Sequence, residues 1–186
     1  MSRFTSTDLS LAGLKLIEHN ILADSRGFMF RVFCAEELST TGWHKPVVQI
    51  NYTYTAQRGT VRGMHYQSAP RTEMKLVTCL QGKVWDVAVD VRAGSSTFLQ
   101  WHAECLSAEN NRALLIPEGF AHGFQALTDD VILLYCHTAA YSPEAEAALN
   151  AQDPHLAIKW PLAIKELSIR DAKHRLIDAK FEGVGL

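Results

Sequence analysis

Two histidines in strand-like runs are the residues best suited to chemistry in this sequence. His65 lies in "VRGMHYQ" (residues 61–67), and His122 lies in "LIPEGFAHGF" (residues 115–124). An imidazole on the inner face of a strand can ligate a metal, or it can act as a general base near neutral pH. The sequence must therefore be tested for both kinds of site.

A metal site in a β-barrel usually draws on a His-x-His pair, because alternation places residues i and i+2 on the same face of a strand. Here the second position is Gln67, and a carboxamide is a poor ligand for zinc or iron. Glu73 and His122 could still join His65 around a ferrous ion. Because the second histidine of the pair is missing, we expect no metal. A metal-dependent oxygenase or isomerase is kept as the alternative function from a different class.

Proton transfer at His65 would require a carboxylate that orients the imidazole through its second nitrogen. A hydrogen-bonded core histidine without a catalytic role is the competing interpretation for His65 taken alone. Three aspartates are candidates for the orienting carboxylate, and the sequence does not choose between them: Asp86, Asp90 and Asp171.

An acid and two cations could complete a proton-transfer site. Tyr135 follows Val131 and Leu133 in strand parity, so it should face the interior with them. Lys75 and Arg62 stand in strand-like runs, where cations suit a developing oxyanion or phosphate groups. The alternatives are that the tyrosine only packs in the core and that both cations reach solvent from strand ends.

The elements that must position these residues are short strands. From about Leu14 to Leu134 the chain alternates β-type segments with turns, and "KVWDVAVDV" (residues 83–91) has clear period-two alternation. This pattern favours a sandwich or barrel over βαβ units. Residues 142–162 are predicted to be a loop with a helical turn, and residues 168–180 a helix capped by Ser168.

Composition limits the possible functions. The chain has 186 residues with 47% hydrophobic and 20% charged residues and a net charge of -2, which is typical of one soluble domain without a nucleic-acid or membrane partner. The N-terminus lacks an apolar signal-peptide region, and the four cysteines form no CxxC pair. Reduced thiols in the cytoplasm are therefore expected.

Several motifs together identify the chain as similar to a known family. They include "QINYTYTAQRGTVRGMHYQSAP", "MKLVTCLQGKVWDVAVDVRAGSSTF", "LIPEGFAHGFQAL", "YSPEAE", "DPHLAIKWP" and "LSIRD". In this order and spacing they resemble dTDP-4-dehydrorhamnose 3,5-epimerases of the cupin superfamily, from about "DSRGFMF" to "LSIRD".

The resemblance implies a fold and an assembly. The fold would be an all-β cupin jelly roll, or double-stranded β-helix barrel, forming one domain over residues 1–186 with short C-terminal helices at about residues 164–180. A homodimer is implied, in which an N-terminal arm of about residues 1–35 pairs with the partner subunit. The family implies no metal and no cofactor.

The resemblance also implies the reaction, which is inversion of C3 and C5 in a dTDP-linked 4-keto-6-deoxyhexose. His65 would be the general base, Asp171 its orienting carboxylate, Tyr135 the general acid and Lys75 the group that stabilises an enolate. Family positions that bind the nucleotide or the sugar would be occupied by Arg26, Gln49, Asn51, Arg62, His122, Tyr141, Glu146 and Arg170, with Tyr141 stacking on the thymine.

Two residues depart from the family pattern. Arg31 stands where a glutamate is common, and Glu73 stands where the usual "QxKLV" has glutamine. An epimerase that inverts C3 alone, acting on a related nucleotide sugar in antibiotic or surface-polysaccharide synthesis, shares the same motifs and is the main alternative. A non-catalytic nucleotide-sugar binder is a third hypothesis.

Overall fold

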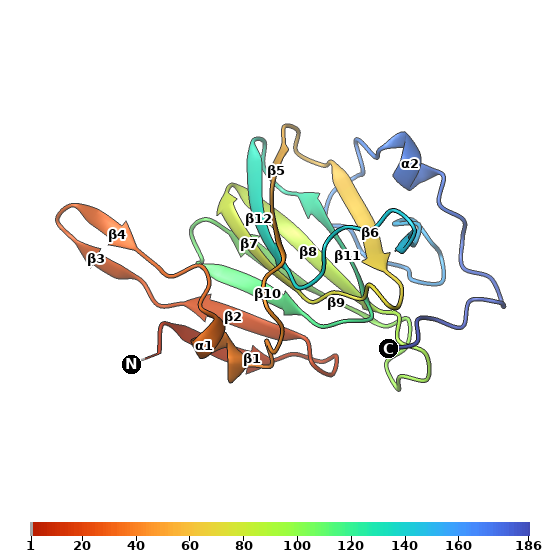
Figure 1. Cartoon of the computed structure of the whole chain (residues 1–186). Coiled ribbons are helices and arrows are strands. Elements are labelled where there is room, and N and C mark those ends of the chain that lie inside the picture. The colour runs from red at the N-terminus through yellow and green to blue at the C-terminus, as the bar shows by residue number, and fades with distance from the viewer. Residues whose placement is uncertain (1) are drawn as a thin grey trace.

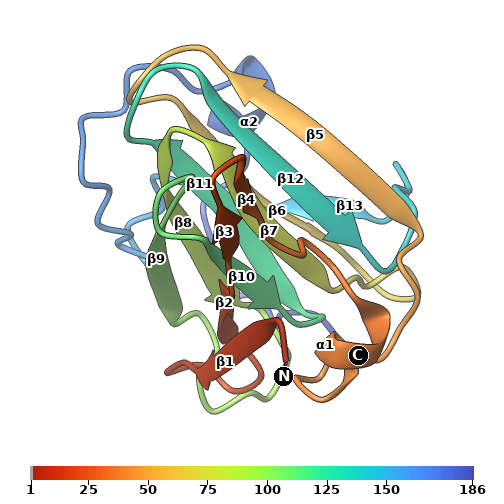
Figure 2. The ribbon, with the colours of Figure 1, turned by 90° about the vertical axis from the view of Figure 1, so that its left-hand side faces the viewer.

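The strands form two antiparallel sheets that face each other in the computed structural model, which describes residues 2–186 (Figures 1 and 2). The six-stranded sheet has the order β1 (Phe4–Asp8), β2 (Lys15–His19), β10 (Arg112–Ile116), β7 (Lys75–Gln81), β12 (Val131–His137) and β5 (Gln49–Thr55). The five-stranded sheet has the order β13 (Glu146–Ala148), β6 (Val61–Gln67), β11 (Phe120–Ala126), β8 (Lys83–Asp90) and β9 (Trp101–Ser107). The predicted all-β jelly-roll class is confirmed.

Three smaller elements complete the chain. Strands β3 (Leu22–Asp24) and β4 (Gly27–Met29) form a separate hairpin, α1 (Ala35–Ser39) follows it, and α2 (Ile169–Ala172) lies near the C-terminus. Among residues 2–186, no helix is long and apolar enough to cross a membrane.

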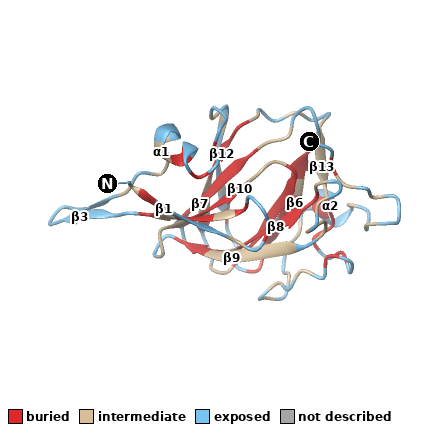
Figure 3. Cartoon of the chain, turned by 90° about the horizontal axis from the view of Figure 1, so that it is seen from below, coloured by how far each residue is buried: buried red, intermediate tan, exposed pale blue. Residues whose placement is uncertain are grey.

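The predicted alternation along β8 explains how both faces of the five-stranded sheet are used. Val84 and Ala88 pack between the two sheets, whereas Val87 and Val89 pack on the outer face beneath the C-terminal segment. Buried residues, red in Figure 3, therefore occur in strands of both sheets, such as β7 and β8. Asp86 lies two residues from both Val84 and Ala88 and has no exposed surface, so it carries a carboxylate into the interior.

The N-terminal residues divide into two parts that the sequence did not separate. Strands β1 and β2 belong to the chain's own six-stranded sheet, because β2 pairs with β10 from Lys15↔Leu115 to Glu18↔Arg112. The β3–β4 hairpin instead extends away from both sheets (Figure 1) and exposes Phe28 and Met29. The expected arm over residues 1–35 is therefore not one structural unit.

Two segments differ from the expected local structure. The Ala-rich run predicted to be a loop with a helical turn contains β13, because pairing with β6 from Gln67 to His65 satisfies that strand's free edge. The predicted helix over residues 168–180 is limited to Ile169–Ala172. Beyond it the carbonyl of His174 accepts from Asn150 and the amide of Ile177 donates to Asp153, so these backbone groups are bound by a loop.

A glycine in β6 permits the close approach of β11. Gly63 has φ +121°, and a Cβ there would lie 2.5 Å from the Cα of Gly123 and 2.7 Å from the carbonyl oxygen of His122. Backbone atoms cannot yield as a flexible side chain does. Close contact between the two strands therefore requires glycine at position 63.

Gly63→Ala is expected to lower the free energy of unfolding by about 2–4 kcal/mol, from backbone strain together with overpacking. Gly94→Ala is the matched control, because Gly94 also has positive φ (+73°) but nothing within 4 Å of its Cβ position. Thermal unfolding of both variants measures the difference. Equal shifts in Tm would contradict the steric explanation.

Candidate active site

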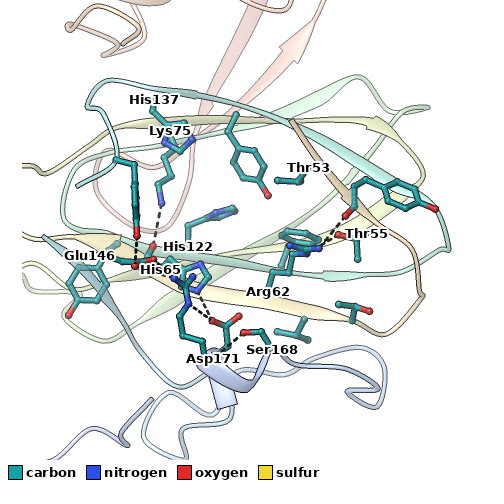
Figure 4. A pocket seen from close by; sticks show the side chains of 18 of the residues that line it. Thr53, Thr55, Arg62, His65, Lys75, His122, His137, Glu146, Ser168 and Asp171 are labelled. Carbon is teal, nitrogen blue, oxygen red and sulfur yellow. Dashed lines mark hydrogen bonds and ion pairs between the residues drawn. The ribbon is translucent and has the colours of Figure 1, made fainter. Parts of the chain in front are cut away.

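A cavity of about 750 Å³ lies between the two sheets, and residues of α2 are among those that line it (Figure 4). Side chains from both sheets and from the C-terminal segment line it. The predicted site residues among them are His65, Tyr135, Asp171, Lys75, Arg62, His122, Tyr141, Glu146 and Arg170.

His65 and Asp171 form a hydrogen-bonded pair across 106 residues of sequence. The Nε2 atom of His65 lies 2.8 Å from Oδ1 of Asp171, and Oδ2 of Asp171 accepts from the amide of Gly63 at 3.4 Å. Ser168 caps α2 by accepting from the amide of Asp171, as predicted, and so fixes the carboxylate above β6. Burial alone would raise the pKa of Asp171, but its hydrogen bond and charge interaction with His65 lower it below the usual range.

An ionised Asp171 determines the tautomer of neutral His65. A carboxylate only accepts hydrogen bonds, so Nε2 of His65 carries the hydrogen that is donated to it. The Nδ1 atom then keeps its lone pair. This is the arrangement that a general base requires.

Tyr135 faces the interior from β12, as strand parity predicted. Its ring lies edge-on to His122 at 5.8 Å and is stacked on His137 at 5.9 Å. Burial raises the pKa of the Tyr135 hydroxyl well above its usual value, and the charge of Asp86 raises it further. The phenol is therefore held in its protonated form, which can donate a proton but does not lose one readily to solvent.

His122 has its own carboxylate partner at the base of the cavity. Its Nε2 atom lies 2.8 Å from Oδ1 of Asp86, and both residues are buried. Asp86, one of the three aspartates considered for His65, is thus committed to His122. Asp90 is bound by Arg92, Ser95 and Thr97 in a separate network.

Lys75 is buried rather than extended to solvent. Its Nζ atom lies 3.3 Å from Oε1 of Glu73 and donates to the carbonyl oxygen of His65 at 3.4 Å. Oε2 of Glu73 lies 2.8 Å from Nδ1 of His137. The ammonium group of Lys75, at the start of β7, therefore shares the Glu73 carboxylate with the imidazole of His137. Figure 4 shows Lys75 beside His137.

The mouth of the cavity carries a second charged group. Glu146 on β13 accepts from the hydroxyl of Tyr141 at 2.9 Å and pairs with Arg170 on α2 at 2.9 Å. Tyr141 is half exposed, so part of this aromatic residue is accessible to a ligand. Arg62 donates to the carbonyl of Tyr54 and lies on the opposite side of the opening.

Three predicted binding residues lie outside the cavity lining. Arg26 is at the turn of the β3–β4 hairpin, where its side chain pairs with Asp24. Gln49 and Asn51 are on β5. Their side-chain amides form hydrogen bonds with each other, with the imidazole of His137 and with the backbone amide of Tyr141. The cavity of one chain therefore does not include these three side chains.

The metal set considered from sequence is not assembled. His65, His122 and Glu73 each have a different partner, which is Asp171, Asp86 and His137 respectively. Among residues 2–186, the side chains of a type that can ligate a metal and that do lie close together are those of His65, Asp171 and His174.

His137 is a cavity residue that the sequence reasoning missed. It follows Tyr135 by two residues on β12, so the same parity that placed the tyrosine inside also places the histidine inside. The residues "YCH" (135–137) contain that signal. The contact of His137 with Glu73, 64 residues away in sequence, could not be predicted from it.

The departure at Arg31 is accommodated within the chain. Its guanidinium pairs with Glu37 on α1, and its carbonyl oxygen lies 3.0 Å from Nδ1 of His19. Arg31 does not line the cavity. The charge reversal therefore concerns contacts at the base of the hairpin.

Comparisons with known proteins agree with this geometry. The sequence model of the dTDP-4-dehydrorhamnose 3,5-epimerase family matches residues 8–179. A dTDP-4-dehydrorhamnose 3,5-epimerase of Sinorhizobium fredii is 43% identical over 153 residues, which are 82% of this chain and 78% of that protein.

Two solved structures are similar over most of the chain. One is a dTDP-6-deoxy-D-glucose-3,5-epimerase from Legionella pneumophila in complex with dTDP-4-keto-L-rhamnose, with a TM-score of 0.90 and 42% identity over 97% of this chain and 98% of that chain. The other is a 3'-monoepimerase from Streptomyces bikiniensis in complex with dTDP-quinovose, with a TM-score of 0.84 and 36% identity over 90% and 85% of the two chains. The chain is therefore an isomerase that belongs to the dTDP-4-dehydrorhamnose 3,5-epimerase family.

Proposed function

We propose that this protein inverts C3 and C5 of a dTDP-linked 4-keto-6-deoxyhexose and converts dTDP-4-dehydro-6-deoxy-D-glucose to dTDP-4-dehydro-L-rhamnose. The observation that carries the proposal is that the two proton-transfer groups come from facing sheets. His65 comes from β6 of the five-stranded sheet and Tyr135 from β12 of the six-stranded sheet, and both line one cavity. A pyranose ring between them would meet a base on one face and an acid on the other.

The first half of the reaction is removal of a proton from a carbon next to the C4 ketone. Nδ1 of His65 takes this proton, and the electron pair of the C–H bond moves to the C4 oxygen, which gives an enolate. Lys75 places its ammonium group beside that oxygen, and Asp171 stabilises the imidazolium that has formed. Preorganised charge of this kind is commonly the largest contribution to rate acceleration at such a site.

The second half returns a proton to the opposite face of the same carbon. Tyr135 supplies it, the enolate collapses to the ketone, and the configuration of that carbon is inverted. His65 then loses its proton and Tyr135 regains one, so atoms and charge balance over the cycle. C3 and C5 both flank C4, so one site for the oxyanion serves both inversions.

The mouth of the cavity suits the nucleotide. Tyr141 offers an exposed aromatic face for a base, while Arg170 and Arg62 offer guanidinium groups for the diphosphate. His122, paired with Asp86, would contact the sugar from the base of the cavity. We assign these contacts to a dTDP-sugar.

We further propose that the protein is a homodimer in which the β3–β4 hairpin packs on the partner subunit. The hairpin exposes Leu22, Phe28 and Met29 and carries Arg26 at its turn, away from the cavity of its own chain. Packing on a second copy would bury these side chains, and Arg26 could then serve the partner's nucleotide.

The experiment that tests the function is hydrogen exchange in heavy water, followed by NMR, with dTDP-4-dehydro-6-deoxy-D-glucose as substrate. Deuterium should appear at C3 and at C5 together with the L-rhamnose configuration. Deuterium at C3 alone would make the enzyme a 3-epimerase, the activity named for the Streptomyces bikiniensis relative. No exchange with this substrate or with other nucleotide-linked 4-keto sugars would overturn the proposal.

A further inference from the structure

We infer that Glu73 and His137 form a positioning pair that fixes the ammonium group of Lys75 in the direction of the reacting carbonyl. Neither residue was assigned a role in the acid–base steps above. The inference rests on the proposed function, because it gives the two residues a task in stabilising the enolate. It is supported by a series of hydrogen bonds that ends at Lys75 and in which each donor and acceptor can be assigned.

The chain of hydrogen bonds begins at the backbone amide of Tyr141. The amide N–H of Tyr141 can only donate, so the atom of Gln49 that lies 2.9 Å from it is the acceptor Oε1. The other amide atom of Gln49, Nε2, then donates to Oδ1 of Asn51 at 3.0 Å. This leaves Nδ2 of Asn51 as the donor that faces Nε2 of His137 at 3.3 Å.

The tautomer of His137 follows from its neighbours. Because Nε2 of His137 accepts from Asn51, the hydrogen of the neutral imidazole is on Nδ1. That hydrogen is donated to Oε2 of Glu73 at 2.8 Å. The stacked ring of Tyr135 holds the imidazole in this plane, at an interplanar angle of 22°.

Glu73 is an acceptor between two donors. Oε2 accepts from His137, and Oε1 lies 3.3 Å from Nζ of Lys75. The side chains of Glu73 and Lys75 each have only 9% of their surface exposed. Burial alone would raise the pKa of Glu73, but the hydrogen bond from His137 and the charge of Lys75 lower it. The carboxylate therefore supplies the counter-charge that a buried ammonium group needs.

The geometry assigns the three N–H donors of Lys75. One faces Glu73, and a second is donated to the carbonyl oxygen of His65 at 3.4 Å. His65 lies on β6 and Glu73 lies two residues before β7, so the two partners contact the ammonium group from different segments of the chain. The third N–H is left for a ligand in the cavity, which in the proposed reaction is the C4 oxygen.

The pair also explains why glutamate replaces glutamine at position 73. A glutamine amide would turn its oxygen toward one neighbour and its NH₂ toward the other. Both neighbours, His137 and Lys75, are donors, so one contact would become donor against donor. A carboxylate accepts from both. Glu73 and His137 are thus matched to each other, and neither would serve Lys75 equally well alone.

The test compares Glu73→Gln, His137→Leu and His137→Asn by the rate of deuterium incorporation, resolved into kcat and KM. Glu73→Gln and His137→Leu should each lower kcat by about tenfold with little change in KM, because a displaced ammonium group loses stabilisation of the enolate. His137→Asn keeps an N–H donor close to the place of Nδ1, so it should recover most of the loss. A thermal unfolding measurement on each variant separates these effects from incomplete folding.

A second arm measures Glu73→Gln in a Lys75→Met background. A residue that acts through Lys75 should cause no further loss of exchange there, whereas a residue needed only for folding should cause the same loss in both backgrounds. Wild-type kcat in Glu73→Gln and His137→Leu, or equal losses in His137→Asn and His137→Leu, would overturn the inference. Absence of exchange in the wild-type protein would instead overturn the proposed function itself, so the two failures are distinguishable.

Discussion

His65→Ala is expected to lower deuterium incorporation at C3 and at C5 by about a thousandfold. A positioned general base contributes about 10²–10⁴ in rate. His65 is the cavity imidazole whose Nδ1 is free in the tautomer set by Asp171. The other cavity imidazoles are less suited: both ring nitrogens of His137 have partners, and the side chain of His122 is only 6% exposed, against 29% for His65. Both positions should be affected, since one base is proposed to serve both carbons.

The measurement is NMR of the substrate in heavy water at saturating protein, with His44→Ala as the control. His44 is exposed, and its Nδ1 contacts the carbonyl of Gly42, so removing its imidazole should leave exchange unchanged. A circular-dichroism melt must show that the His65 variant is folded, because the substitution leaves Asp171 with one partner fewer. Exchange at the wild-type rate in folded His65→Ala would remove the general base from the mechanism.

Tyr135→Phe is expected to separate exchange from inversion. Loss of the hydroxyl removes the proton donor but leaves His65, Asp171 and Lys75 in place. Proton removal and its return from the base side should therefore continue, and deuterium should still enter. Inversion should fall by about 10²–10⁴, the scale of one general acid. The hydroxyl is suited to this role because burial raises its pKa and so keeps it protonated.

The ratio of exchanged to inverted sugar in one reaction provides an internal control for this variant. Wild-type protein should give nearly one inversion for each exchange event, and Tyr135→Phe should give many exchanges for each inversion. A variant that loses both in proportion would point to a general defect in binding or folding. A variant that inverts normally would assign the proton donor to another group in the cavity.

The sequence by itself determined the fold class and pointed to nine of the residues that line the cavity. Period-two alternation, such as that of Val131, Leu133 and Tyr135, is a local property that survives in any sheet, so it correctly predicted which side of β12 faces inward. The same rule could have identified His137. The Ser168 cap was also predictable, because a cap joins residues only three positions apart.

The extent of the C-terminal helix and the existence of β13 were not predictable in this way. Local composition favoured a longer helix and a loop, but the backbone groups involved find partners far away in sequence. The amide of Ile177 donates to Asp153, and β13 pairs with the edge of β6. Tertiary hydrogen bonds thus outweighed weak local propensity.

The pairing of charges was decided only by the tertiary structure. The sequence offered three aspartates for His65, and the fold brought Asp171 to it, gave Asp86 to His122 and enclosed Asp90 among its own neighbours. Likewise, Glu73 became the partner of His137 and Lys75, although the sequence suggested it as a metal ligand. The physical reason is that alternation fixes only the face on which a side chain lies, whereas a hydrogen bond depends on how distant strands are paired and in which register.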